Sequence, residues 1–189
     1  MTNTKIDLCS QALVKLGAKS IASMDENTTE AMVAQQLYEP TLRHLLSSYP
    51  WRFSLRQECL GRLDETPLTD YPYAFQIPND CLRILSAGQN TKSSGLIYRL
   101  VGQKLYAKVP EVVLTYLSRP EENTFPPFFN QALTDTLAAQ FCLPLTESSA
   151  RTDYMSKCAT ESVSKARLID SQQSVHSCFQ DFSLIEVRS

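Results

Sequence analysis

The sequence has few of the residues that usually build a reaction centre. Its 189 residues include five glycines and two histidines. The glycines do not cluster, so a loop that cradles phosphate is not expected. Neither His44 nor His176 has a His, Cys or Asp at ligand spacing, and there is no Gly-x-Ser-x-Gly elbow. We therefore expect no enzyme activity, no catalytic residue, no metal site and no cofactor.

The carboxylates show no arrangement that suggests acid–base chemistry. They are scattered along the chain. Asp64-Glu65 precedes a proline, and Glu121-Glu122 lies in a predicted loop. Both pairs are expected to be solvated rather than to act together as acid and base.

The chain also lacks a basic excess and a long apolar run. Its 18 Lys and Arg against 20 Asp and Glu give a net charge of −2. Proteins that grip nucleic acid by its phosphates are usually basic, so a small helical DNA-binding module is only the alternative interpretation. No apolar run approaches the roughly 20 residues that span a bilayer. The first residues lack the blocks of a signal peptide, so we expect a soluble protein made in a cytoplasm, without membrane contact.

Cysteines are present, but none forms a Cys-x-x-Cys pair that would indicate a metal or redox site. Most of them have apolar or small neighbours, where cysteine behaves as a small hydrophobe. We expect reduced thiols, with an incidental disulfide or a metal site as the alternatives, at the six positions Cys9, Cys59, Cys81, Cys142, Cys158 and Cys178.

The first third of the chain predicts two helices. The first has a one-sided apolar stripe from Leu8 to Leu16, and Gly17 follows at a C-cap position. The second begins at 27–30, where Asn-Thr-Thr-Glu has the pattern of a capping box. Pro40 should kink or break this second helix, because proline removes a backbone donor. The two helices are expected to pack as an antiparallel hairpin.

The middle of the chain predicts a small antiparallel β unit. Five short β-branched or aromatic runs are separated by turn residues, and Gly102-Gln103 is a candidate hairpin turn. The runs are 73–77, 82–85, 96–100, 104–108 and 112–117.

Helices are predicted again after residue 127. Phe129, Leu133, Leu137 and Phe141 repeat every four residues, and Pro144 is expected to end this helix. The next helix runs to about Asp170 with a thin apolar stripe, which favours burial against another subunit. Residues 171–189 lose helical periodicity and are either a frayed tail or an arm that orders on a partner.

The densest aromatic cluster contains Tyr49, Trp51 and Phe53, with the only tryptophan of the chain. It lies between the helical hairpin and the β unit, where a large apolar anchor would fix their angle. Two alternatives remain, a subunit interface and stacking on nucleic acid, because arginines flank the aromatic residues.

Four segments resemble the head-to-tail adaptors of tailed phages, and in particular tail tubular protein A of podovirus-like phages. The opening from Ile6 to Ala18 is similar to the start of these proteins, and Leu45–Ser54 resembles their Pro-Trp-x-Phe stretch. The third segment resembles their Pro-x-Asp-Cys-Leu-Arg element, which here is Pro78, Asn79, Asp80, Cys81, Leu82 and Arg83. The ending Ser183–Arg188 resembles their terminal motif, except that Leu184 stands where tryptophan is common.

The resemblance implies a virion protein of the head–tail junction that forms a ring of about twelve subunits, a closed assembly of heterologous contacts. Its partners would be the portal, a tail or nozzle protein, and DNA that passes through without specific binding. The β unit would face the tail. The C-terminal arm would bind the portal through Phe179, Phe182, Leu184, Ile185, Val187 and Arg188.

The expected fold is α+β and mainly α: an antiparallel helical bundle with a small antiparallel β insertion and an extended C-terminal arm. The predicted divisions are a helical hairpin at 1–57, the β insertion at 58–124, the C-terminal helices at 125–170 and the arm at 171–189.

Overall fold

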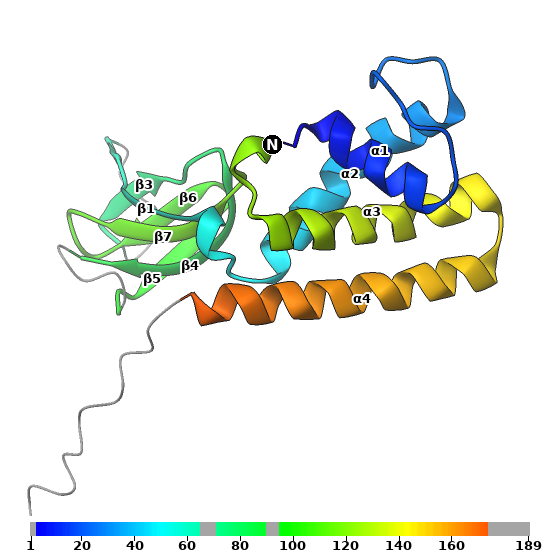
Figure 1. The fold of residues 1–189 in the computed structure, drawn as a ribbon. Coiled ribbons are helices and arrows are strands. Elements are labelled where there is room, and N and C mark those ends of the chain that lie inside the picture. Colours follow the sequence, from blue (N-terminus) through cyan, green and yellow to red (C-terminus); the bar gives the residue numbers. More distant parts are fainter. Residues whose placement is uncertain (1–2, 65–70, 90–94, 174–189) are drawn as a thin grey trace, which may run out of the picture.

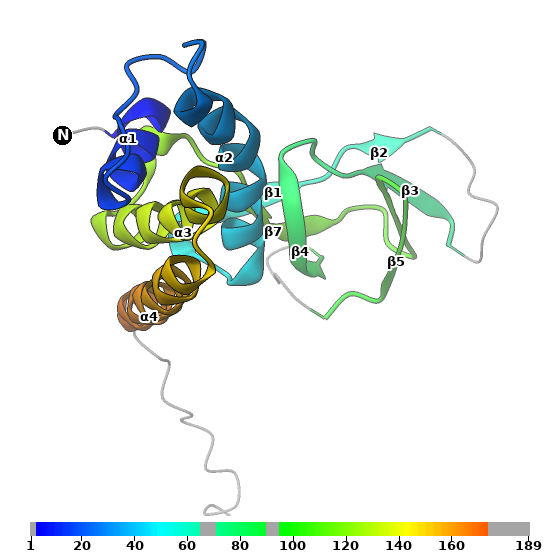
Figure 2. The ribbon, with the colours of Figure 1, turned by 90° about the vertical axis from the view of Figure 1, so that its right-hand side faces the viewer.

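The computed structural model describes residues 3–64, 71–89 and 95–173. Within these ranges the chain forms four α-helices and seven strands, and the helices and the sheets make two halves side by side (Figures 1 and 2). The helices are α1 (Lys5–Lys15), α2 (Thr29–Ser48), α3 (Pro127–Thr146) and α4 (Ser149–Gln172). The strands are β1 (Leu55–Cys59), β2 (Arg62–Leu63), β3 (Tyr73–Gln76), β4 (Cys81–Gly88), β5 (Tyr98–Val101), β6 (Lys104–Ala107) and β7 (Val113–Ser118).

The first two helices begin at threonine caps. A capping box is present, but it starts α1 and not α2: Thr4 accepts from the backbone of Asp7, whose side chain accepts in return. At α2 only the hydroxyl of Thr28 caps, by accepting from the backbone of Ala31. Gly17 follows α1 with φ +68, as the C-cap prediction requires.

Two internal prolines do not end their helices. Helix α2 runs through Pro40 to Ser48, and α3 runs through Pro144 to Thr146. The expectation that Pro144 stops its helix is therefore wrong by two residues. Glu147 then adopts a left-handed conformation with φ 53, and Ser148 caps α4 by accepting from the backbone of Arg151.

Helix α3 is the centre of the helical half. Helices α1, α2 and α4 all pack against it, and α1 and α2 each contact α3 more extensively than they contact each other. The expected pairing of α1 with α2 as an antiparallel hairpin is therefore secondary to their packing on α3. The α3 stripe supplies Phe129, Leu133, Leu137 and Phe141, all fully buried.

The strands form two antiparallel sheets and not one small unit. One sheet has the order β1-β7-β4, and the other has the order β2-β3-β6-β5. All five predicted runs contribute strands, and Gly102 turns the β5–β6 hairpin with φ 60. Strand β7 is central in its sheet because it pairs with β1 on one side and β4 on the other.

The prediction of a mainly helical bundle with a small β insertion is therefore wrong. The fold is a mixed α/β fold, in which 51% of the residues that the structure describes are helical and 21% lie in strands. The strands that the sequence did not predict are β1 and β2. All five residues of β1 are exposed. A strand without a buried face does not need alternating apolar and polar residues, which is the pattern that predicts strands from sequence. The extended arm was predicted at 171–189, but Ser171 and Gln172 belong to α4, and residues 174–189 lie outside the described residues.

Candidate functional site at the junction of helices and sheets

The aromatic cluster lies where the helical half meets the sheets. After α2 ends, Tyr49 is extended and the chain passes through Pro50 into a short turn at Arg52–Ser54. The Trp51 ring is fully buried and packs edge-on against Tyr49 and Phe129, with centroid distances of 4.9 and 5.1 Å. Its indole Nε1 donates to the carbonyl of Leu45 at 2.9 Å.

The third aromatic residue of the cluster continues the packing toward α3. The Phe53 ring lies 4.7 Å from the ring of Phe129 and 5.8 Å from that of Phe125. Tyr49, Trp51 and Phe53 therefore join the end of α2 to the start of α3 by ring contacts. The rings are turned into the helical core, which leaves the face of Trp51 closed to a stacking base.

The Pro-x-Asp-Cys-Leu-Arg element starts β4 at the same junction. The carbonyl of Pro78 accepts from the backbone of Cys81 in a tight turn, at 3.1 Å. Leu82 packs against the helical core, and Arg83 donates from Nη1 to the carbonyl of Ser47 at 3.2 Å. The structure therefore brings this element to the last turn of α2, close to the aromatic cluster.

Asp80 of this element ties β4 to the rest of its sheet. Its carboxylate accepts from the hydroxyl of Tyr116 at 3.3 Å and from Arg56 at 3.4 Å. The Tyr116 hydroxyl also lies 3.1 Å from Glu58 on β1. Burial and the two carboxylates raise the pKa of Tyr116, so its hydroxyl stays protonated and can act as a donor.

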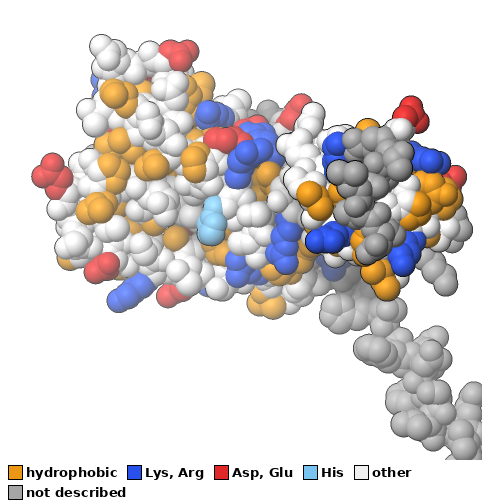
Figure 3. Space-filling model, turned by 180° about the vertical axis from the view of Figure 1, so that it is seen from behind, with side chains coloured by type: hydrophobic (Ala, Val, Ile, Leu, Met, Phe, Trp, Pro, Cys, Tyr) orange, Lys and Arg blue, Asp and Glu red, His pale blue; other side chains and the backbone are white. Residues whose placement is uncertain are grey.

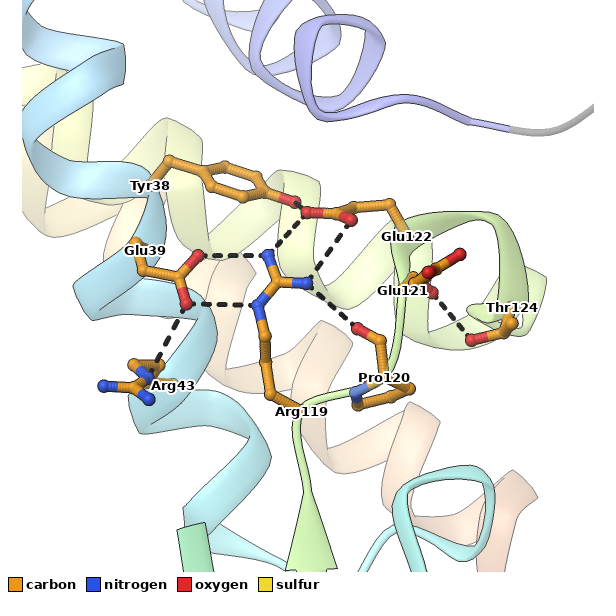
Figure 4. Close-up of polar contacts among 8 residues, drawn as sticks. All are labelled: Tyr38, Glu39, Arg43, Arg119, Pro120, Glu121, Glu122 and Thr124. Atoms are coloured by element: carbon orange, nitrogen blue, oxygen red, sulfur yellow. Dashed lines mark hydrogen bonds and ion pairs between the residues drawn. The ribbon is translucent and has the colours of Figure 1, made fainter. Parts of the chain in front are cut away.

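Sequence analysis missed a charged network at the junction, which Figure 4 shows in close-up. The Arg119 guanidinium, just after β7, donates to Glu39 of α2 at 3.0 and 3.1 Å. It also donates to Glu122 at 2.7 Å, and Glu122 accepts from the hydroxyl of Tyr38 at 3.2 Å. The expectation that Glu121-Glu122 is a solvated pair is thus wrong for Glu122.

The side chains of the network stay charged because hydrogen bonds and opposite charges compensate for the cost of burying them. Burial alone would raise the pKa of Glu122, but hydrogen bonds from Arg119 and Tyr38 and the charge of Arg119 outweigh it and lower this pKa. Arg119 reaches Glu39 with two parallel hydrogen bonds, the geometry that suits a guanidinium and a carboxylate. The network therefore connects β7, α2 and the loop before α3.

Two further contacts complete the junction. The Ser54 and Ser118 side chains are buried, and each hydroxyl donates to the other residue's carbonyl, at 2.8 and 3.2 Å. Asp170, near the end of α4, accepts from the backbone of Arg52 at 3.3 Å and is 1% exposed. Burial raises the pKa of Asp170, against the opposing effect of Arg52.

Helix α4 leaves most of its surface uncovered. Only Ala159, Ala166 and Asp170 are buried among its 24 residues. The large apolar side chains of Tyr154, Leu168 and Ile169 are 65%, 60% and 44% exposed. Figure 3 shows that hydrophobic side chains are also scattered over the opposite face, on helices and sheets alike.

Other site classes give the following findings. Within 3–64, 71–89 and 95–173, no group of three or more His, Cys, Asp or Glu could hold a metal ion. In the same ranges no helix is long and apolar enough to cross a membrane. The five cysteines described there are free. The predicted portal-binding residues, from Phe179 to Arg188, lie outside the described residues.

Comparison of the chain with known proteins gives no family name. No protein-family model matches it, and no curated protein matches it either.

Proposed function

We propose that the protein is a structural head-to-tail adaptor of a tailed phage or prophage. It forms a ring between the portal and the tail, and DNA passes through the hole. The observation that carries this proposal is the thinly buried face of α4, which exposes Tyr154 and Leu168. A long helix with so little apolar burial in its own chain is suited to complete that burial against a neighbouring subunit.

The junction supports the same proposal. The two internal segments that resemble adaptor proteins, Leu45–Ser54 and Pro78–Arg83, meet at the last turn of α2. Their contacts fix the sheets against the helices, which suits a part that carries load between two rings. The portal, the tail protein and other copies of the chain are the proposed partners, and residues 174–189 form the proposed portal-binding arm.

An assembly experiment tests this function. The full chain is mixed with the portal ring of the same phage and examined by electron microscopy. We expect rings bound to the portal, and we expect capture to be lost when residues 174–189 are deleted, because repeated weak contacts by the arm supply the binding strength.

Two variants separate ring contacts from general damage. Leu168→Asp places a charge on the exposed face of α4 and should prevent rings, whereas Ile97→Asp changes a 79% exposed side chain of the β half and should not. Rings that form equally well with Leu168→Asp would contradict the proposed interface. Tight, salt-sensitive binding of duplex DNA by a monomer would instead support the alternative, a DNA-binding module.

A further inference from the structure

A groove of about 330 Å³ opens in the β half, between the start of β4 and the β5–β6 hairpin. One wall carries Ile77, Leu82 and Ile84, and the other carries Tyr98 and Leu100. Arg83 is the only charged residue among the side chains that line it. The exposed lining is therefore mixed: apolar side chains form about half of it, and polar groups, including the charged Arg83, form the rest.

Strand β5 borders this groove and has a free edge in the part of the chain that the structure describes. It pairs with β6 alone, in a regular register from Tyr98 to Val101. Strand β4 is also an edge strand, but its register shifts twice, and such irregularities hinder pairing with a further strand. The regular edge of β5 is thus the better template for an added strand.

We propose that residues 182–188 of the same chain occupy this groove as a strand added to the edge of β5. Their sequence, Phe-Ser-Leu-Ile-Glu-Val-Arg, lies outside the described residues. Side chains of a strand alternate between faces, so Ile185 and Val187 can point together into the groove beside Tyr98 and Leu100. Glu186 then lies on the opposite face, which is the face of Arg99.

Charge favours this occupant. Between Phe182 and Arg188 the only charged residues are Glu186 and Arg188. In the proposed arrangement the carboxylate of Glu186 meets the guanidinium of Arg99 across the strand pair, and opposite charges at such positions are stabilising. Like charges at these two positions would be destabilising. Exchanging the charges of Glu186 and Arg99 therefore tests the register of the proposed strand pair.

The contacts at the end of α2 place the last turns of α4 near the groove. Arg83, in the groove wall, donates to Ser47, and Arg167 of α4 donates to the neighbouring Ser48 at 3.1 Å. Helix α4 ends at Gln172, shortly after Arg167. Residues 174–181 can then span up to about 26 Å in extended form, so the docking is assigned to the same chain and not to a second copy.

This inference concerns the free chain and does not require the proposed adaptor function. If the protein is an adaptor, the groove holds the arm until a portal binds it. If it is not, the segment still covers an exposed strand edge, which would otherwise pair with other chains.

Hydrogen exchange of the full chain tests the docking. The amides of 182–188 should be protected in the unmodified protein, because strand pairing removes them from water. Leu100→Lys, which blocks the groove, should reduce this protection by about tenfold or more. Val101→Lys is the matched control, since Val101 is the next residue, is similarly exposed (50% against 46%) and lies on the other face of β5. It should leave the protection unchanged.

A charge exchange tests the register. Glu186→Lys should lower the protection, and Glu186→Lys combined with Arg99→Glu should restore it. Unprotected amides in the unmodified chain, equal losses in both β5 lysine variants, or protection that rises with protein concentration would each overturn the proposal.

Discussion

The two halves of the molecule bury apolar side chains to different extents. The helical core contains 22 buried residues around Trp51, Phe129 and Phe141, whereas the core of the sheets contains eight. The sheets instead have exposed strands such as β1 and edges that carry Leu100 and Val101. Side-chain packing therefore dominates the stability of the helices, while backbone pairing and turn geometry contribute more to the sheets.

The junction differs from both halves because it adds polar contacts to the packing of its aromatic cluster. Arg83, Arg119 and the Ser54–Ser118 pair connect elements that are far apart in the sequence. Buried polar groups such as those of Ser54 and Ser118 are costly when one partner is missing. Three substitutions therefore test the comparison: one in the helical core, one at the junction and one in the sheets.

The largest effect is expected for Trp51→Ala. The substitution removes a fully buried ring, its contacts with Tyr49 and Phe129, and the hydrogen bond to Leu45. Loss of a buried Trp side chain costs about 3–5 kcal/mol of unfolding free energy. The measurement is urea unfolding followed by circular dichroism, because Trp51 is the only tryptophan and its fluorescence is lost with it.

Tyr154→Ala is the control for this variant. Tyr154 is an aromatic residue on α4, but it is 65% exposed, so its loss should change the free energy of unfolding of the monomer by no more than about 0.5 kcal/mol. Similar losses for Trp51→Ala and Tyr154→Ala would show that packing on Trp51 does not dominate the helical half.

An intermediate effect is expected for Arg119→Met. The variant leaves the carboxylates of Glu39 and Glu122 without their guanidinium partner. Because these side chains are partly solvated, we expect a loss of about 1–2 kcal/mol rather than the larger value of a fully buried pair. Arg119→Lys keeps the charge but not the paired hydrogen bonds, and should lie between Arg119→Met and the unmodified protein.

The lowered pKa of Glu122 also predicts how the effect of Arg119→Met on stability changes with pH. The pKa of Glu122 is lowered in the folded protein, so its contribution to stability is fully present above the ordinary pKa of glutamate. The contribution is lost as the pH falls through the lowered value. The stability difference between the unmodified protein and Arg119→Met should therefore shrink as the pH falls below the ordinary pKa of glutamate. A difference that grows on acidification would contradict the role of this ion pair.

The sequence predicted the helices better than the sheets, and the reason is physical. Helix α1 has an apolar stripe that arises from burial on one side, and the central helix α3 repeats large apolar residues every four positions, so periodicity reveals both. Strand β1, Leu-Arg-Gln-Glu-Cys, is exposed throughout, and its place is set by pairing with β7. That pairing joins residues some 60 positions apart, such as Leu55 and Leu117, which no local pattern indicates.

The sequence also predicted only part of the candidate site. The aromatic cluster at Tyr49–Phe53 and the element at Pro78–Arg83 were both singled out from sequence, but their meeting at the end of α2 was not. Arg119 and Glu39 are 80 residues apart, and each resembles an ordinary surface charge. A signal was nevertheless present, since Arg119 lies between a strand and an acidic loop, where a charge is often held by a neighbour.

The smallest of the three effects is expected in the sheets, for Gly102→Ala. Gly102 has a φ of +60 in the β5–β6 turn, which is unfavourable for a residue with a Cβ, although no atom would clash with it. We expect a loss of about 1 kcal/mol, measured by hydrogen exchange of β5 and β6 and by urea unfolding. Gly61→Ala is the matched control, because Gly61 also has open space around it but no positive φ, and should cost less. If both alanine variants lose equal stability, turn geometry is not what distinguishes the sheets from the helices.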